Sequence, residues 1–176
     1  MLWLMGVLAL CASAQQKGIE PDWNMRPVLQ EIAAHAQRLS SVLEKIDAKG
    51  MLQNGAPDTY AAQIESSKAQ AKALAAEALE LANSPEKLSA DLQAFLRILS
   101  LERTVPSIEQ ALRKYWNPAL ADPLSREMTS NGANRERFQR YIVELAAERE
   151  QEYAIMDHEA QRCRGMLAKQ PKTEKK

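Results

Sequence analysis

Apolar side chains recur at alternating steps of three and four residues over long segments of this chain, a spacing that places them on one face of an α-helix. The apolar residues are also good helix formers, because the 176 residues include 28 Ala and 21 Leu but only 17 Val, Ile and Thr together. This composition favours helix over strand. The length suits one globular domain. We therefore predict an all-α protein.

Four segments carry the helical spacing, and residues at their ends mark where the helices start and stop. Pro27 suits the first position of a helix, Gly50 a left-handed C-cap and Ser84 an N-cap. Pro106 lies inside the third segment and predicts a kink or a break near Arg103. The four segments cover residues 27–49, 57–81, 85–115 and 134–167, with room for a short connecting helix at 122–130.

Four amphipathic helices with short connections bury their apolar faces most simply as an antiparallel bundle crossing at about 20°. We predict this bundle for residues 27–168. An alternative is a pair of helical hairpins that completes its core only in a homodimer. The apolar stripe of the last helix has the spacing of a coiled coil and is expected to face the core. It consists of Ile142, Ala146, Arg149, Tyr153, Met156, Ala160, Cys163 and Leu167, with the charge of Arg149 reaching water.

The first 14 residues form an uncharged apolar run that predicts a secretory signal peptide cleaved after Ala14. The run is too short to span a bilayer, so we expect no stable membrane span in the mature chain. Residues 15–26 follow as a polar linker, and residues 169–176 as a disordered basic tail. We therefore expect export to the periplasm or the extracellular space, with association with the cell envelope left open. A lipoprotein signal ending at Cys11 is the alternative.

Cleavage would remove Cys11 and leave Cys163 as the single cysteine of the mature chain, so no intramolecular disulfide could form. Because Cys163 lies on the apolar stripe, we expect a buried thiol that behaves as a small hydrophobic side chain. An intermolecular disulfide through Cys163 is the main alternative, and a reactive thiol is the third.

Motifs for enzymes and cofactors are incomplete in this sequence. His158 and Glu159 begin the helical zinc-protease pattern, but Arg162 occupies the second ligand position, and a cation there would repel the metal. A non-covalent haem held by Met25 and His158 is an alternative supported by those two residues alone. His35 is expected to bond to Glu31, one helical turn earlier. The balanced charge, 23 basic against 23 acidic side chains, argues against nucleic acid as a partner. We therefore predict no catalytic residue, metal or cofactor.

Three aromatic residues remain as candidates for contact with a partner. Tyr115 and Trp116 directly precede a turn, and Trp23 lies in the N-terminal linker. Such residues anchor partners at interfaces, but they also close the ends of helical bundles. We predict an exported, non-enzymatic helical protein that acts through protein–protein contacts as a scaffold, an adaptor or a chaperone-like binder. A helical bundle that holds haem, a metal or a small apolar molecule is the alternative.

Overall fold

The structure is a computed structural model that describes residues 24–168. This range is all-α, as predicted, with six helices and no strand. The helices are α1 (Arg26–Leu43), α2 (Ala48–Gln53), α3 (Asp58–Leu81), α4 (Leu88–Tyr115), α5 (Pro118–Ser130) and α6 (Gly132–Ala168).

The apolar stripes of the first two long helices are buried, which confirms the prediction from their spacing. Both stripes belong to one hydrophobic core. Tyr60 is half-buried, at the start of α3. Three members of the α3 stripe, Ser67, Ala71 and Ala78, are small, so α1 and α3 can approach closely there. The buried stripe residues are Leu29, Ile32, Ala36, Leu39 and Leu43 on α1, Ile46 after it, and Ile64, Ser67, Ala71, Leu74, Ala78 and Leu81 on α3.

The prediction that the first helix ends at Gly50 is wrong. α1 ends at Leu43, and the chain starts the short helix α2 after Asp47. The Asp47 carboxylate accepts a hydrogen bond from the backbone N–H of Gly50 at 3.1 Å, which is the standard role of an N-cap. Gly50 is therefore an interior residue of α2. Gly55, which follows this helix, has a φ of +88°, a left-handed conformation that glycine adopts at little cost.

Three other boundaries differ from the predictions. Ser84 does not cap α4, which begins three residues past Pro85 with Lys87 at the N-cap position. α4 then continues through Pro106, so the break, one of the two alternatives predicted near Arg103, does not occur. α5 starts at Pro118 because the side chain of Asn117 caps it, accepting a hydrogen bond from Ala119 N at 3.0 Å.

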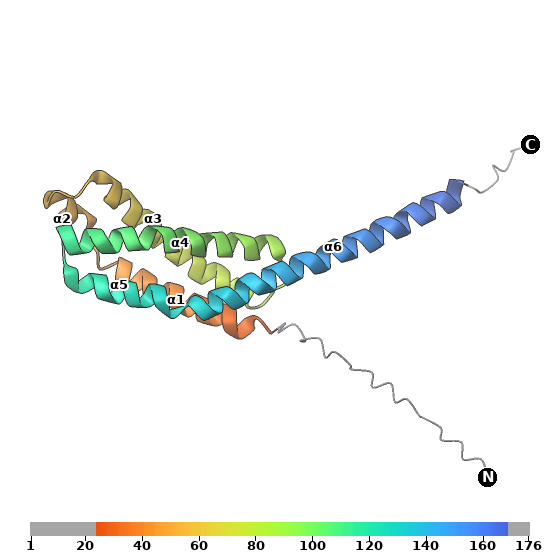
Figure 1. Ribbon diagram of the computed structural model, residues 1–176, viewed down its shortest axis with the longest axis horizontal. Coiled ribbons are helices and arrows are strands. Elements are labelled where there is room, and N and C mark those ends of the chain that lie inside the picture. Colours follow the sequence, from red (N-terminus) through yellow and green to blue (C-terminus); the bar gives the residue numbers. More distant parts are fainter. Residues whose placement is uncertain (1–23, 169–176) are drawn as a thin grey trace, which may run out of the picture.

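The long helices α1, α3 and α4 pack side by side, and α5 with the first part of α6 completes the group (Figure 1). α5 and α6 follow each other along the same side of this group instead of folding back at residue 131. The second part of α6 continues past the end of the other helices and projects away from them. The prediction that the whole last helix lies in the bundle is therefore wrong.

Several predictions fall on residues outside the described range. They are the signal peptide at 1–14, the start of the linker at 15–23 with Trp23, and the tail at 169–176. No helix within residues 24–168 combines the length and the apolar character that crossing a membrane would require.

Candidate interaction surface

The two halves of α6 have opposite surroundings. In the first half, Phe138, Ile142 and Leu145 are at most 5% exposed and belong to the core. Phe138 packs edge-on against Phe95 of α4, with ring centroids 6.4 Å apart. Every residue from 149 to 166 is exposed, which is the part of α6 that projects in Figure 1. The large apolar side chains in this half are Tyr153 at 71%, Ile155 at 65%, Met156 at 63% and Met166 at 56%.

One face of α6 runs through both halves. Steps of three and four residues lead from Phe138 and Ile142 to Tyr153, Met156, Ala160 and Cys163, so the same side of the helix first packs on the bundle and then faces solvent. We call Tyr153, Met156, Ala160 and Cys163 the projecting stripe. Arg149, at its start, is exposed and bonds to Glu152 at 2.7 Å, so it does not bury its stem in a core as expected.

Cys163 is exposed, so the prediction of a buried thiol is wrong. The physical reason is that its stripe has no neighbouring helix within residues 24–168. The alternatives that require access, an intermolecular disulfide or a reactive thiol, remain predictions.

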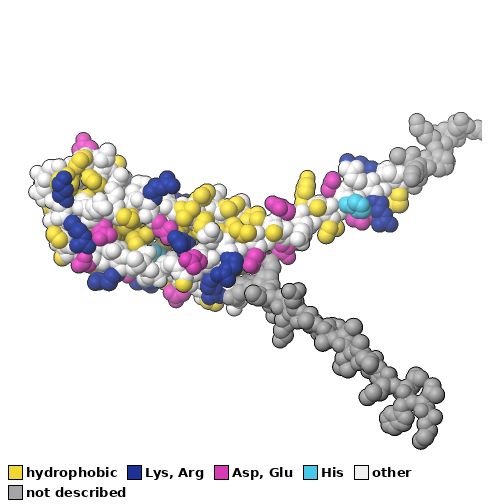
Figure 2. Space-filling model, viewed as in Figure 1, with side chains coloured by type: hydrophobic (Ala, Val, Ile, Leu, Met, Phe, Trp, Pro, Cys, Tyr) yellow, Lys and Arg dark blue, Asp and Glu magenta, His cyan; other side chains and the backbone are white. Residues whose placement is uncertain are grey.

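A second apolar area lies on α4. This helix carries apolar residues on two opposite sides, and the bundle buries the side that contains Leu101, Val105 and Ile108. The other leaves Leu92, Leu96 and Leu99 exposed at 43%, 62% and 40%. Figure 2 shows hydrophobic side chains gathered over the first half of α4, near the point where α6 leaves the bundle. An exposed apolar area next to a projecting apolar helix indicates a surface for contact.

The predicted contact residues Tyr115 and Trp116 lie at the far end of the bundle, beside α2. The Tyr115 ring packs against Tyr60 with centroids 6.2 Å apart, and its backbone carbonyl accepts a hydrogen bond from Asn54 at 3.0 Å. Trp116 lies against Gly50 and is 38% exposed. The structure thus places both residues where they close an end of the bundle, and it does not bring them near Cys163.

Adding a methyl group at Gly50 is expected to destabilise the protein by about 1 to 3 kcal/mol, the usual cost of overpacking. A Cβ there would overlap the ring of Trp116 and lie 2.8 Å from Asp47 Oδ2, so the ring must move. Urea unfolding of Gly50→Ala measures the loss of stability, and tryptophan fluorescence reports the movement of the Trp116 ring. Gly165→Ala is the matched control, because nothing lies within 4 Å of a Cβ at that position. Equal stability of the two variants would contradict the contact.

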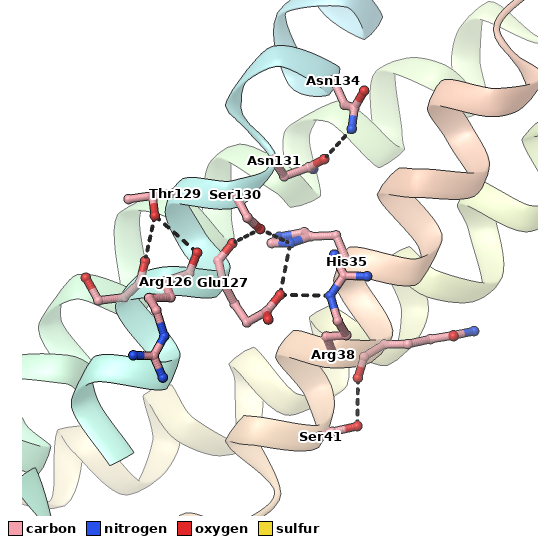
Figure 3. A network of polar contacts seen from close by, with 11 residues as sticks. His35, Arg38, Ser41, Arg126, Glu127, Thr129, Ser130, Asn131 and Asn134 are labelled. Carbon is pink, nitrogen blue, oxygen red and sulfur yellow. Dashed lines mark hydrogen bonds and ion pairs between the residues drawn. The ribbon is translucent and has the colours of Figure 1, made fainter. Parts of the chain in front are cut away.

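A polar network joins α1 to the end of α5, and Figure 3 shows its residues. His35 Nδ1 lies 3.5 Å from Ser130 Oγ and 3.7 Å from Glu127 Oε2. Glu127 Oε2 also accepts a hydrogen bond from Arg38 Nε at 3.1 Å. His35 is only 6% exposed and takes its partners from α5, so the predicted bond to Glu31 is wrong.

This network contains a serine, a histidine and a carboxylate, but its geometry differs from that of a catalytic triad. In a triad the histidine uses one ring nitrogen for the nucleophile and the other for the acid. Here both Ser130 and Glu127 approach Nδ1, and the Ser130 hydroxyl donates to the Glu127 carbonyl at 2.9 Å. The cavity beside His35 has a volume of about 10 Å³, room for roughly one water molecule. The network is suited to joining helices.

His35→Asn is expected to make the protein less sensitive to acid. Burial lowers the pKa of His35 from its usual 6.5, more than the opposing attraction of Glu127 raises it. The folded state therefore prefers the neutral ring. The stabilisation that the neutral His35 ring provides is complete above pH 6.5, the pKa of the unfolded chain. It is lost as the pH falls through the lower pKa that His35 has in the folded protein. Free energies of unfolding measured across this window test the prediction. His158→Asn, at an exposed position, should keep the acid sensitivity of the wild type.

The proposed haem ligands are not brought together. Met25 is a core residue at 2% exposure, whereas His158 is exposed on the projecting half of α6. Arg162 is likewise exposed there and pairs with Glu159 at 3.7 Å. Within residues 24–168, no three His, Cys, Asp or Glu side chains gather in a way that could hold a metal ion.

Comparisons with protein-family models, curated proteins and solved structures found no match to this chain.

Proposed function

We propose that this protein is an exported, non-enzymatic helical protein that acts by binding another protein chain through the projecting half of α6. The observation that carries the proposal is that one apolar face, buried as far as Leu145, continues without cover through Met156. Leaving a face of this kind in water has a cost, which contact with a partner would remove.

The helix itself supports the same proposal. Most helical stability in proteins comes from packing of an apolar face, and the projecting half of α6 has no neighbouring helix within residues 24–168 to supply it. The projecting half has the alternation that such packing needs, with charged side chains between the apolar ones (Figure 2). A scaffold or adaptor would present a helix in this way, held at one end by a folded bundle.

Site-specific photo-crosslinking in the cells that make the protein tests the proposal. A photoreactive amino acid at Tyr153, on the projecting stripe, should give discrete adducts with a protein chain. The same amino acid at Gln151, which lies on the opposite side of the helix, is the matched control and should give few. Absence of adducts from position 153, or equal yields from both positions, would overturn the proposal.

Export is part of the proposal and has its own test. The apolar run at 1–14, followed at once by polar residues, supports cleavage after Ala14. Intact mass measurement of the protein purified from its own cells should give a chain that starts at Gln15. A chain that retains residues 1–14 would contradict export by this route, and a lipid adduct on Cys11 would replace it with anchoring.

A further inference from the structure

We infer that the partner of the projecting stripe is a second copy of this chain, bound as an antiparallel pair of α6 helices. This inference rests on the proposed function and adds to it the identity and the orientation of the partner. Its observations are the exposed stripe, the distribution of charge along the projecting half, and the small residues at the centre of the stripe.

Charge changes sign along the projecting half of α6. Residues 148–159 contain five acidic side chains and one basic one, whereas residues 160–168 contain two basic side chains and no acidic one. Two parallel helices would place acidic segment beside acidic segment. Two antiparallel helices place the basic end of each beside the last part of the acidic segment of the other, which contains Asp157 and Glu159. Because opposite charges attract and like charges repel across such pairs, the charges select the antiparallel orientation.

The stripe also sets a register. Asp157 and Arg164 are one heptad apart, and both flank the stripe. An antiparallel pair that places Asp157 of each copy beside Arg164 of the other puts Ala160 opposite Cys163 at the centre. Ala and Cys are small, so the two helices can approach closely there. Met156 lies further out, where its longer side chain can cover the partner helix, and Tyr153 lies beyond the level of the partner's residue 168.

This register is compatible with the projecting shape of the molecule. When Ala160 faces Cys163 of the partner, residue 168 of the partner falls opposite Ile155. The described part of the partner helix therefore ends before the bundle begins, and the two bundles lie at opposite ends of the pair. Cys163 faces alanine and not its own copy, so the pair forms without a disulfide.

The first test compares two neighbouring substitutions. Met156→Glu places a charge on the projecting stripe, whereas Ile155→Glu places the same charge about 100° around the helix, outside the stripe, at nearly equal exposure, 63% against 65%. Sedimentation equilibrium of the wild type should show a monomer–dimer equilibrium. Met156→Glu should weaken the dimer by about tenfold or more, and Ile155→Glu by less than about threefold. A wild type that stays monomeric, or equal losses in both variants, would overturn the inference.

The second test determines orientation. In Cys11→Ser protein that keeps Cys163, the substitution Ala160→Cys gives each copy two cysteines on the stripe. Mild oxidation followed by peptide mapping should find residue 160 joined to residue 163 of the other copy. Links of 160 to 160 and of 163 to 163 would instead show parallel helices and overturn the antiparallel assignment.

The photo-crosslinking experiment separates failure of the two proposals. Adducts at position 153 that contain a second copy of this chain support both. Adducts with a different protein alone leave the proposed function in place and overturn the pairing of identical chains. Absence of any adduct counts against both.

Discussion

Asp91→Asn is expected to stabilise the protein by about 2 to 3 kcal/mol near pH 8 and to have little effect near pH 4. Asp91 is fully buried in the first turn of α4, and neither oxygen of its carboxyl group has a hydrogen-bond partner. Burial, with a smaller effect of Glu86, raises the pKa of this carboxyl group to about 7 from 3.8. The shift is large because a charged carboxylate without a partner is poorly tolerated away from water.

The direction of this effect follows from the two pKa values. Below pH 3.8 the carboxyl group is protonated in both the folded and the unfolded chain, so it causes no penalty. As the pH rises from there to about 7, the unfolded chain releases the proton while the folded chain retains it, and stability is lost. Asparagine does not ionise, so the variant avoids the loss.

Urea unfolding of wild type and Asp91→Asn at several pH values measures the difference directly. Glu31→Gln serves as control, because Glu31 is exposed and its replacement should change stability by less than about 0.5 kcal/mol. The pH dependence from Asp91 is opposite in sign to that from His35, so each variant should remove one limb of the stability profile. A difference between Asp91→Asn and wild type that does not vary with pH would contradict the assignment.

Sequence periodicity predicted the core of the bundle well because the pattern and the burial there have the same cause. On α1 and α3, apolar residues at steps of three and four all lie against neighbouring helices. Helix ends were less predictable. Gly50 has the properties of a helix terminus, but Asp47, three residues earlier, starts a new helix by capping its N–H. A helix end at Gly50 and a helix start at Asp47 are both compatible with the sequence. Only the packing of Trp116 on Gly50 distinguishes these two interpretations.

The candidate surface could be predicted only in part, since periodicity shows that a helix has an apolar face and does not show what covers it. The stripe of α6 was identified through Met156 and Cys163, yet it was assigned to a core that does not extend so far. One signal was available. The buried half of the stripe contains Phe138 and Leu145. Arg149 then interrupts the stripe, and the projecting half contains the small residues Ala160 and Cys163. This composition is closer to a coiled-coil seam than to the interior of a bundle.

The buried contact that holds α6 to the bundle can be compared with the exposed half of the same helix by substituting one aromatic residue in each. Phe138 is fully buried and packs on Phe95, and it lies on the same helical face as Tyr153. Tyr153 is 71% exposed. The two aromatic residues therefore share a helix and a face but differ in burial.

Phe138→Ala is expected to cost about 3 to 5 kcal/mol, because it removes a buried ring and leaves a cavity between α4 and α6. Tyr153→Ala should cost less than about 0.5 kcal/mol when measured at a protein concentration low enough to keep the chain monomeric. Urea unfolding of both variants gives the comparison. If the bundle end at Phe138 anchors the projecting helix, Phe138→Ala should also lower the yield of photo-adducts from position 153, because a loosely attached helix presents its stripe less well. Similar costs for the two substitutions would show that the face of α6 is covered to the same extent in its buried and projecting halves, and would contradict an uncovered surface.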